Sequence, residues 1–492
     1  MRKIRFVSFL LSLWVLSSCT DILDKEPYGL SNFWQTPADA ELGINAAYEP
    51  LLFEEVYGRG QFWMSAASDD FIVNRDKPTE KLLTSFSTNE NTSSYAYSYW
   101  KHMYQIIRRA NDVLENVPQI GMDAELKDRI LGEANFLMGF GYFQLVRRYG
   151  GVPFYDYQKP DEINKPRETT EESYRRIEEY LQTAAELLPW THSAEAVGRA
   201  HKGAALGLLA KVYAYQQKWQ ESKDASGQVI NSGKYTLTER YQDIFTIEHE
   251  KASENLFAVQ CNPVRHESTI TSIVQLPGTI TNGSGWKYFA PTFSLAKAFE
   301  PGDERRAATL VDIDGGVFRF DGEDITLSEN LVGAWGTAHI AVKYVHPYQE
   351  KYVGWESGLD IPVLRYSDVL LLNAEAIIML NGGGPNAPDL GVAAAATAFN
   401  QVRVRAFAGD GSKAITAPSF TDLVHERRCE FAFEEQRHYD LVRWGLAEEV
   451  YNAGIDDPRG SRPFDASVHS LFPLPQREID NSNGMLKQNP GY

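Results

Sequence analysis

Cysteine is scarce in this chain, which contains three in 492 residues: Cys19, Cys261 and Cys429. With so few, the chain can build neither a disulfide framework nor a zinc site of the usual spacing. We expect Cys261, which lies in a strand-like stretch, and Cys429, which lies in a helical pattern, to be free and buried thiols.

An excess of positive charge is also missing. The 66 acidic residues outnumber the 48 basic ones and give a formal net charge of -18 at pH 7. Because phosphate binding requires a basic surface, we expect no nucleic acid among the partners. Hydrophobic residues make up 43% of the chain, which is enough for a large core in one to three domains.

Motifs of known enzymes are absent too. The sequence has no Gly-x-Ser-x-Gly elbow, no phosphate-binding loop ending in Lys-Ser or Lys-Thr, and no Cys-x-x-Cys. A carboxylate pair for glycoside hydrolysis could be drawn from many acidic residues, so that criterion does not discriminate. The acidic, Gly-rich residues 312–324 lack the register of an EF-hand loop and predict a hairpin tip. We therefore expect no cofactor, and a structural calcium ion has no support.

One long apolar run is present, at residues 4–16, and it is too short to span a bilayer. Arg2, Lys3 and Arg5 provide the basic start of a secretion signal, and Leu-Ser-Ser-Cys at residues 16–19 matches a bacterial lipobox. We expect residues 1–18 to be a signal peptide and Cys19 to be acylated, which anchors the protein without spanning the membrane. Ordinary signal cleavage beside an incidental cysteine is the alternative. The polar residues 20–29, interrupted by Pro and Gly, predict an extended linker.

Helical patterns dominate the body of the chain. Residues 169–188 begin with Thr169 three positions before Glu172, a capping box, and carry an apolar stripe until Pro189. That stripe consists of Tyr174, Ile177, Leu181, Ala184 and Leu188. Residues 199–235 resemble a tetratricopeptide helix pair. Within the helical residues 128–151, Gly139 and Gly141 are costly for a helix and predict that neighbouring helices approach closely there.

The middle of the chain, residues 234–360, changes character. Short β-rich runs lie between Gly, Asn and Pro turns at residues 255–261, 315–322 and 339–348. Helices return at residues 367–383, where Ser367 or Asp368 can cap the start and Gly382 can end the helix. The predicted fold is mostly α, with helix pairs as a scaffold and a face of loops and small hairpins.

Residues 425–445 combine arginines, glutamates, histidines and a thiol among aromatic residues, as an active site or a structural element would. A zinc protease needs a second histidine one turn after the first, and His425-Glu-Arg-Arg-Cys lacks it. On a helix, Arg427 could pair with Glu430, and Glu434 could pair with Arg437 or His438. Because charges within an apolar helix must be paired, we interpret the segment as a structural ion network.

Aromatic residues also gather in loops, where helix periodicity does not account for them. Phe71 stands beside Asp70, Asn74 and Arg75, and a Gly-rich loop offers Trp286 and Tyr288. Two further loops contain Trp335 and Trp355. The apolar face of a sugar ring lies flat on such rings, while Asn, Asp and Arg bind its hydroxyl groups. Packing against the core is the alternative for each ring.

Several segments resemble the SusD/RagB family of outer-membrane nutrient-binding lipoproteins along nearly the whole chain. They include GEANFLMGFGYFQLVRRYGGVPF, GLLAKVYAYQQKWQES, IPVLRYSDVLLLNAEAI, HERRCEFAFEEQRHYDLVRWG, LFPLPQREI and QNPGY. The resemblance implies a signal peptide at residues 1–18 and a single domain at 19–492, with an N-terminal part (19–235) and a C-terminal part (236–492). It also implies four tetratricopeptide-like helix pairs and assigns the Glu- and Arg-rich segment to the scaffold.

The resemblance further implies a surface-exposed lipoprotein, anchored to the outer membrane, that binds an oligo- or polysaccharide and breaks no bonds. Its partner would be a TonB-dependent SusC-like transporter, over which it acts as a lid. Trp286 falls where a starch-binding member has its stacking tryptophan, and Phe71 and Asn74 fall where that member has an aromatic residue and an asparagine. The doublet of tryptophans of that member is missing here, which argues against starch.

The expected ligand-binding residues are accordingly Trp286, Phe71, Asn74, Arg75, Asp70, Tyr288 and Trp335. Two other functions stay open from the residues alone: a secreted glycoside hydrolase on a helical scaffold, and a structural assembly protein. A family member that binds a peptide or glycoprotein is a further alternative, because loops set specificity.

Overall fold

The computed structural model describes residues 33–492, apart from 59, 76, 88–93, 158–163, 194–195, 197, 262–275, 282–284, 321, 334 and 346–357. The predicted signal peptide, the acylated Cys19 and Trp355 lie outside the described residues. The division into parts at residue 235 also stays a prediction.

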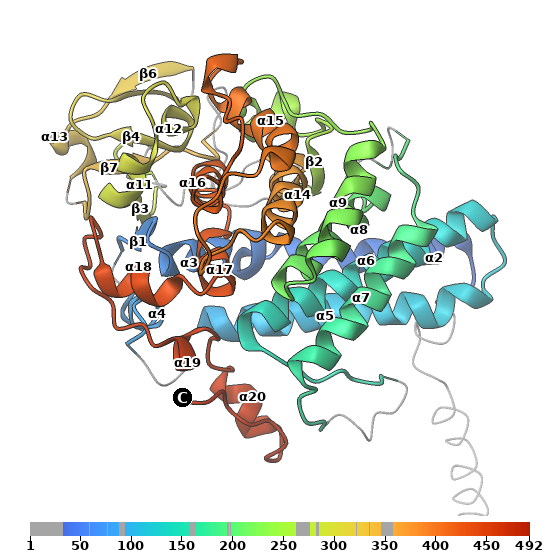
Figure 1. The fold of residues 1–492 in the computed structure, drawn as a ribbon. Helices are drawn as coiled ribbons and strands as arrows, with labels where there is room; N and C mark the ends of the chain where they lie inside the picture. Colours follow the sequence, from blue (N-terminus) through green and yellow to red (C-terminus); the bar gives the residue numbers. More distant parts are fainter. Residues whose placement is uncertain are drawn as a thin grey trace, which may run out of the picture.

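A row of long helices forms the scaffold (Figure 1). They are α5 (Ser94–Asn116), α6 (Ala124–Tyr149), α7 (Thr170–Leu187), α8 (Lys202–Tyr215), α9 (Trp219–Asn231) and α14 (Tyr366–Leu380). Helices α5 to α9 pack in sequence, each against the one that follows it, and α9 then packs against α14. This arrangement confirms the predicted mostly α fold with tetratricopeptide-like helix pairs.

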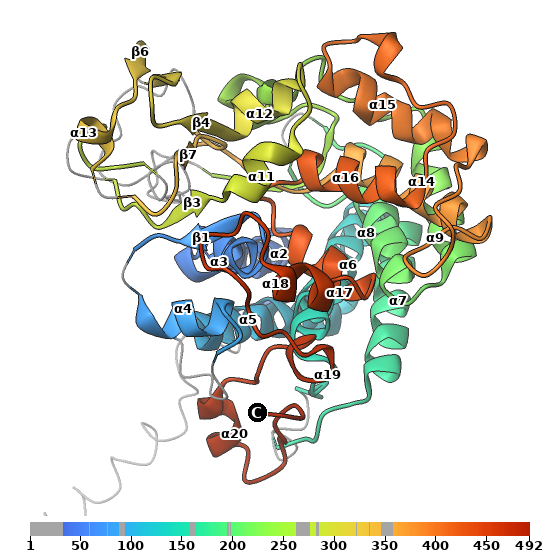
Figure 2. The same ribbon diagram turned by 60° about the vertical axis from the view of Figure 1, so that its left-hand side comes forward.

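Shorter helices from the N-terminal, middle and C-terminal parts of the chain surround this row (Figures 1 and 2). They are α2 (Pro37–Tyr48), α3 (Gly60–Ala67), α4 (Pro78–Thr84), α11 (Phe293–Ala298), α12 (Glu304–Thr309), α13 (Glu329–Val332), α15 (Ala396–Ala406), α16 (Phe420–Glu430), α17 (Arg437–Arg443), α18 (Ala447–Ala453), α19 (Ala466–His469) and α20 (Gln476–Asn481). No helix among the residues that the structure describes is both long and apolar enough to cross a membrane.

Helix α7 shows how the local sequence sets a boundary. The Thr169 hydroxyl accepts a hydrogen bond from the Glu172 backbone N–H at 3.1 Å, which satisfies one of the free donors at the helix start. The Glu172 carboxylate turns outward to Arg175 instead of completing the capping box. All five residues of the predicted stripe are buried. By contrast, neither Ser367 nor Asp368 caps α14, because Arg365 occupies the cap position without a side-chain hydrogen bond.

The two glycines of α6 mark close helix contacts, as predicted. A Cβ atom on Gly139 would lie 2.7 Å from Leu181 of α7, and one on Gly141 would lie 2.8 Å from Ile107 of α5. At each glycine, a side chain of the neighbouring helix occupies the space that a Cβ methyl group would fill. The packing gained there offsets their low helix propensity.

Strands are short and pair in four antiparallel two-stranded sheets within the described residues. The strands are β1 (Phe71–Val73), β2 (Asn255–Val259), β3 (Phe289–Pro291), β4 (Leu310–Asp312), β5 (Val317–Phe320), β6 (Glu323–Thr326), β7 (His339–Ala341) and β8 (Ile361–Arg365). The pairs are β1–β3, β2–β8, β4–β7 and β5–β6. The β5–β6 pair confirms the hairpin predicted at residues 312–324.

The core consists of one large cluster that runs through the helices and a small one beneath β4, β5 and β7. Cys261 and Cys429 are thiols that form no disulfide. Cys429 is buried as predicted, whereas Cys261 is half-buried, because it lies just beyond the end of β2. The small cluster supports the loops that carry Trp335, which packs against it.

The Glu- and Arg-rich segment is a buried ion network, as predicted, but the expected pairs within one helix do not form. Helix α16 ends at Glu430, and the chain then turns through Phe433 and Glu435, both with positive φ (67° and 61°). The carboxylate of Glu430 accepts from Arg365 at 2.7 Å and from Arg405 at 2.6 Å. The turn separates Glu434 from Arg437 and His438. Arg427 and Glu430 share α16 but pair with residues of other elements instead.

Other members of the network also pair across elements. Arg427 binds Asp368 of α14 and Asp440 of α17, at 2.9 and 2.8 Å. Glu434 binds Lys343 at 2.6 Å and Arg365 at 2.8 Å. Burial lowers the pKa of Lys343 to about 8, in spite of the Glu434 carboxylate beside it. The network therefore joins α14, α15, α16 and α17 and the loop after β7 into one frame.

Candidate functional site

Pairing of β1 with β3 brings together loops that lie more than two hundred residues apart in the chain. Val73 lies opposite Phe289, and the backbone N–H of Asn74 donates to the carbonyl of Tyr288 at 2.7 Å. Residues just beyond the strands therefore meet, and the segment around Gly336 joins them. We call the group Asn74, Arg75, Trp286, Tyr288 and Trp335, with the backbone between them, the loop cluster. It contains five of the seven predicted ligand-binding residues.

Asn74 organises the loop cluster through its side-chain amide. Its Nδ2 donates to the carbonyl of Lys287 at 3.2 Å, and its Oδ1 accepts from the backbone N–H of Gly336 at 2.8 Å. A Cβ on Gly336 would lie 3.0 Å from that Oδ1 and 2.7 Å from Ile72, so the close approach depends on glycine. Asn74 thus holds the three segments together and uses both ends of its amide to do so.

Trp286 is half-buried and stands beside Tyr288, with their ring centroids 5.8 Å apart. Lys287 between them adopts the left-handed conformation (φ 54°), which costs a non-glycine residue about 1 kcal/mol or more. Lys287 is held by its Nζ donating to the carbonyl of Val332 at 2.7 Å. Nothing in the residue types of this loop predicted that conformation.

Tyr288 forms the buried base of the loop cluster, and only 3% of its area is exposed. The ring of Trp63 meets it edge-on, with the centroids 6.0 Å apart. The exposed Arg75 guanidinium lies 5.2 Å from its centroid and the Lys77 ammonium 5.8 Å. The prediction of Tyr288 as an exposed ring is therefore wrong, and its position supports Trp286 and Arg75 instead.

Trp335 lies on the third loop and is half-buried. Its indole N–H donates to the carbonyl of His339 at 2.7 Å. The small core cluster packs against it. One part of the ring is thereby fixed to the scaffold and another part stays open to solvent, as is also the case for Trp286.

The predictions for Phe71 and Asp70 are wrong, because both side chains point into the protein. Phe71 is fully buried, as are the other two residues of β1. Its ring stacks on that of Phe433, with the centroids 4.0 Å apart. Asp70 is 1% exposed and accepts from Arg428 at 2.8 Å. Residues 71–73 form the buried strand β1, whereas the sequence pattern suggests a loop there.

The neighbouring carboxylates Asp69 and Asp70 differ in their pKa. Burial raises the pKa of Asp70, although Arg428 opposes the change. For Asp69 burial acts in the same sense, but Arg428 and Arg437 together outweigh it and hold the pKa below its ordinary value. These side chains fasten β1 to α16 and α17, so they belong to the ion network that supports the site.

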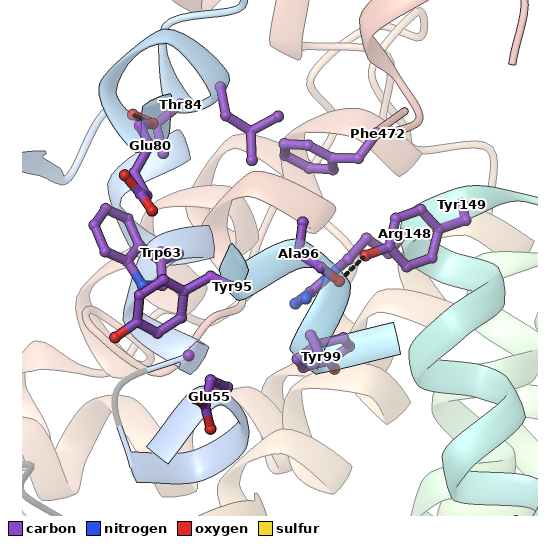
Figure 3. A pocket seen from close by; sticks show the side chains of 12 residues that line it. Glu55, Trp63, Glu80, Thr84, Tyr95, Ala96, Tyr99, Arg148, Tyr149 and Phe472 are labelled. Carbon is purple, nitrogen blue, oxygen red and sulfur yellow. Dashed lines mark hydrogen bonds between the residues drawn. The ribbon is translucent and has the colours of Figure 1, made fainter. Parts of the chain in front are cut away.

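A small cavity lies beside Trp63, whose ring contacts Tyr288 of the loop cluster (Figure 3). Its volume is about 20 Å³, and it is lined by Tyr95, Tyr99, Arg148 and Glu80 among others. Space of that size holds about one water molecule and no sugar ring. This cavity is therefore too small to hold a glycan.

The Cys429 thiol lies near the His425 imidazole, as in a catalytic Cys–His pair, but its surroundings do not activate it. The Cys429 Sγ lies 3.8 Å from the His425 Nε2, and the same nitrogen lies 3.3 Å from a Glu300 oxygen. Because one nitrogen makes both contacts, Glu300 cannot orient the imidazole as the third member of a triad does. Burial raises the pKa of the Cys429 thiol, which keeps it protonated and unreactive.

The fold and the loop cluster define a class: a helical-repeat scaffold that presents half-exposed aromatic rings from loops. Two family models match the chain, one described as the SusD family over residues 326–492 and one described as starch-binding and associating with the outer membrane over residues 22–214. The chain belongs to the SusD-like family. Its members are binding proteins, so the chain is not an enzyme, and the predicted association with the outer membrane is confirmed at the level of the family.

Individual relatives match this chain over most of its length. SusD-like protein P2 of Formosa agariphila is 28% identical over 518 residues, with 99% of each chain covered. A SusD-like protein of Bacteroides ovatus is 25% identical, with 91% of this chain and 84% of that protein covered. A solved laminarin-binding SusD-like protein is 25% identical, with a TM-score of 0.77 over 93% of this chain and all of that one.

A further structural neighbour supports the fold. The surface glycan-binding protein A of Bacteroides thetaiotaomicron, solved in complex with laminarihexaose, is 22% identical with a TM-score of 0.75. The alignment covers 92% of this chain and 100% of that chain.

Proposed function

We propose that the chain captures an oligo- or polysaccharide on the outer face of the loop cluster. The observation that carries this proposal is the grouping of half-exposed Trp286 with exposed Arg75 around a backbone fixed by Asn74. A flat ring beside a guanidinium suits a sugar, since one binds the C–H face and the other the hydroxyl groups. The laminarin-binding and laminarihexaose-bound relatives support the same ligand class.

Capture would serve uptake. In this proposal Cys19 carries the lipid that anchors the protein at the cell surface, and a TonB-dependent SusC-like transporter receives the glycan. A shallow surface with few rings binds weakly, and a polymer offers many repeats that compensate through multiple contacts. Weak binding also allows release to the transporter. A peptide or glycoprotein ligand is the competing proposal, and it predicts no affinity for free glycans.

Replacement of Trp286 by alanine tests the site. A glycan array with the soluble form that begins after Cys19 first identifies a ligand, and calorimetry then measures its affinity. We expect Trp286→Ala to weaken binding by about 30-fold, because truncating a central tryptophan in an interface costs about 2 kcal/mol. Trp219→Ala, a half-buried tryptophan at the start of α9, is the matched control and should bind normally. Equal affinities of wild type and Trp286→Ala would rule out the loop cluster as the site.

Replacement of Cys19 by serine tests the anchor and the partner. We expect the wild-type chain to fractionate with outer membranes and to co-purify with a transporter, because acyl chains hold it at the surface. Cys19→Ser should appear in the soluble fraction. If the serine variant stays in the membrane fraction after washing with high salt, acylation of Cys19 is not the anchor. If no transporter co-purifies with the wild-type chain after chemical cross-linking, the proposed delivery step fails.

A further inference from the structure

A second aromatic surface lies apart from the loop cluster, between α5, α20 and the segment that follows α6. It borders a groove of about 650 Å³. None of the residues of the loop cluster lines it. In both ribbon views α20 lies below α5, whereas β3 and α13, beside the loop cluster, lie toward the opposite upper side (Figures 1 and 2).

Three tyrosine rings stand in series along this groove. The centroids of Tyr104 and Tyr155 are 5.4 Å apart, and those of Tyr155 and Tyr157 are 6.0 Å apart. All three side chains are half-buried, so each keeps part of a ring surface open. Trp100 closes the inner wall, 5.1 Å from Tyr104 between centroids. Ordinary core packing would cover these rings, and here it does not.

The rings are held in place by contacts of their own. The hydroxyl of Tyr104 donates to the carbonyl of Pro153 at 2.8 Å, which fixes α5 to the segment that carries the other two tyrosines. The Arg108 guanidinium lies 4.6 Å from the ring centroid of Tyr157. Trp100 of α5 and Glu478 of α20 line the same groove. A preorganised surface of this kind loses little entropy when a ligand binds.

Polar groups alternate with the rings around the groove. Lys101 and Arg108 provide positive charge, while Asp156 and Glu478 provide negative charge. Gln105 and His102 contact each other at 3.1 Å and add neutral donors and acceptors. The balance of charges argues against an anionic ligand, and the polar rim argues against an acyl chain, which would favour an apolar lining.

We propose that this groove is a second carbohydrate-binding site, which takes a neutral hexose oligosaccharide on the faces of Tyr104, Tyr155 and Tyr157. Sugar chains repeat an apolar ring face and a set of hydroxyl groups, and the groove repeats rings and hydrogen-bonding side chains in the same way. The site is additional to the proposed loop-cluster site. Two sites on one anchored protein would hold a polymer longer than either site alone.

Fluorine NMR of the soluble chain labelled with 3-fluorotyrosine tests this site. The probes are laminarihexaose, maltohexaose and cellohexaose, each titrated to millimolar concentration, with signals assigned from single Tyr→Phe variants. We expect at least one hexasaccharide to shift the Tyr155 and Tyr157 signals in a saturable manner. Arg108→Gln should weaken that response at least threefold without disturbing the fold, because Arg108 is exposed. Arg175→Gln on α7, also exposed, is the matched control.

The two sites can fail separately. The Trp286→Ala variant should keep the response at Tyr155 and Tyr157. Tyr157→Ala should lose the response at Tyr155 and keep binding at the loop cluster. The second site is overturned if none of the three probes shifts these signals, or if Trp286→Ala abolishes the shift. It is also overturned if only the purified transporter, and no sugar, perturbs these signals, since the groove would then be a protein interface.

Discussion

Replacement of Arg365 by alanine is expected to lower the free energy of unfolding by about 3–5 kcal/mol. Arg365 is 1% exposed, and it binds Glu254, Glu430 and Glu434 at 2.8, 2.7 and 2.8 Å. Its removal leaves those carboxylates buried with less positive charge around them. The desolvation penalty of the unpaired carboxylates exceeds the lost attraction between Arg365 and its partners. A buried charge without a partner has lost its hydration and gains no protein contact in exchange. Urea denaturation followed by circular dichroism measures the change.

Two comparison variants separate the causes. Arg365→Lys keeps the charge and loses the planar fork that reaches Glu430 and Glu434 together, so we expect an intermediate loss. Arg175→Ala removes an exposed ion pair with Glu172 on α7, and we expect no measurable change in the urea midpoint. If Arg365→Ala unfolds at the same urea concentration as Arg175→Ala, the network is not part of the frame.

Replacement of Phe71 by alanine is expected to be nearly as destabilising, by about 3–5 kcal/mol. The Phe71 ring is fully buried and stacks on Phe433, which in turn stacks on Phe62 with centroids 4.4 Å apart. Alanine would leave a cavity within this stack, and close-packed neighbours can collapse into it only in part. The same urea titration measures the loss.

Affinity for glycan distinguishes this structural role from the ligand-binding role first assigned to Phe71. Phe71→Leu keeps most of the apolar volume, so we expect a smaller loss of stability and an unchanged dissociation constant in calorimetry. A weaker affinity in folded Phe71→Leu, with the urea midpoint close to that of wild type, would show that the ring contacts the ligand after all.

Much of the scaffold could be predicted because its signals are local. A capping threonine, a stripe at helical spacing and two costly glycines act over one or two turns, and each was found where the sequence placed it. The ion network was also predictable as a whole, since charges inside an apolar segment require partners. Its pairs were not, because α16 ends at Glu430 and the partners come from other elements.

The site was predictable only in part. Composition and resemblance predict Asn74 and Trp286 as site residues, and β1–β3 pairing does bring them together. Exposure could not be inferred, so Phe71, Asp70 and Tyr288 were wrongly assigned to the surface. The sequence does not predict the groove at Tyr155. Tyr104 lies on a helix, where aromatic residues ordinarily belong to the core. Tyr155 and Tyr157 lie in a loop, and only the tertiary structure brings that loop against α5.

The sequence by itself determined the helical class, the buried ion network and the family of this protein. These depend on short-range periodicity, on the cost of unpaired charge and on motifs that span the chain. Only the tertiary structure decided which loop residues meet, which rings stay open and which charges pair. Those properties arise where segments hundreds of residues apart come into contact, and no single stretch of sequence encodes such a contact.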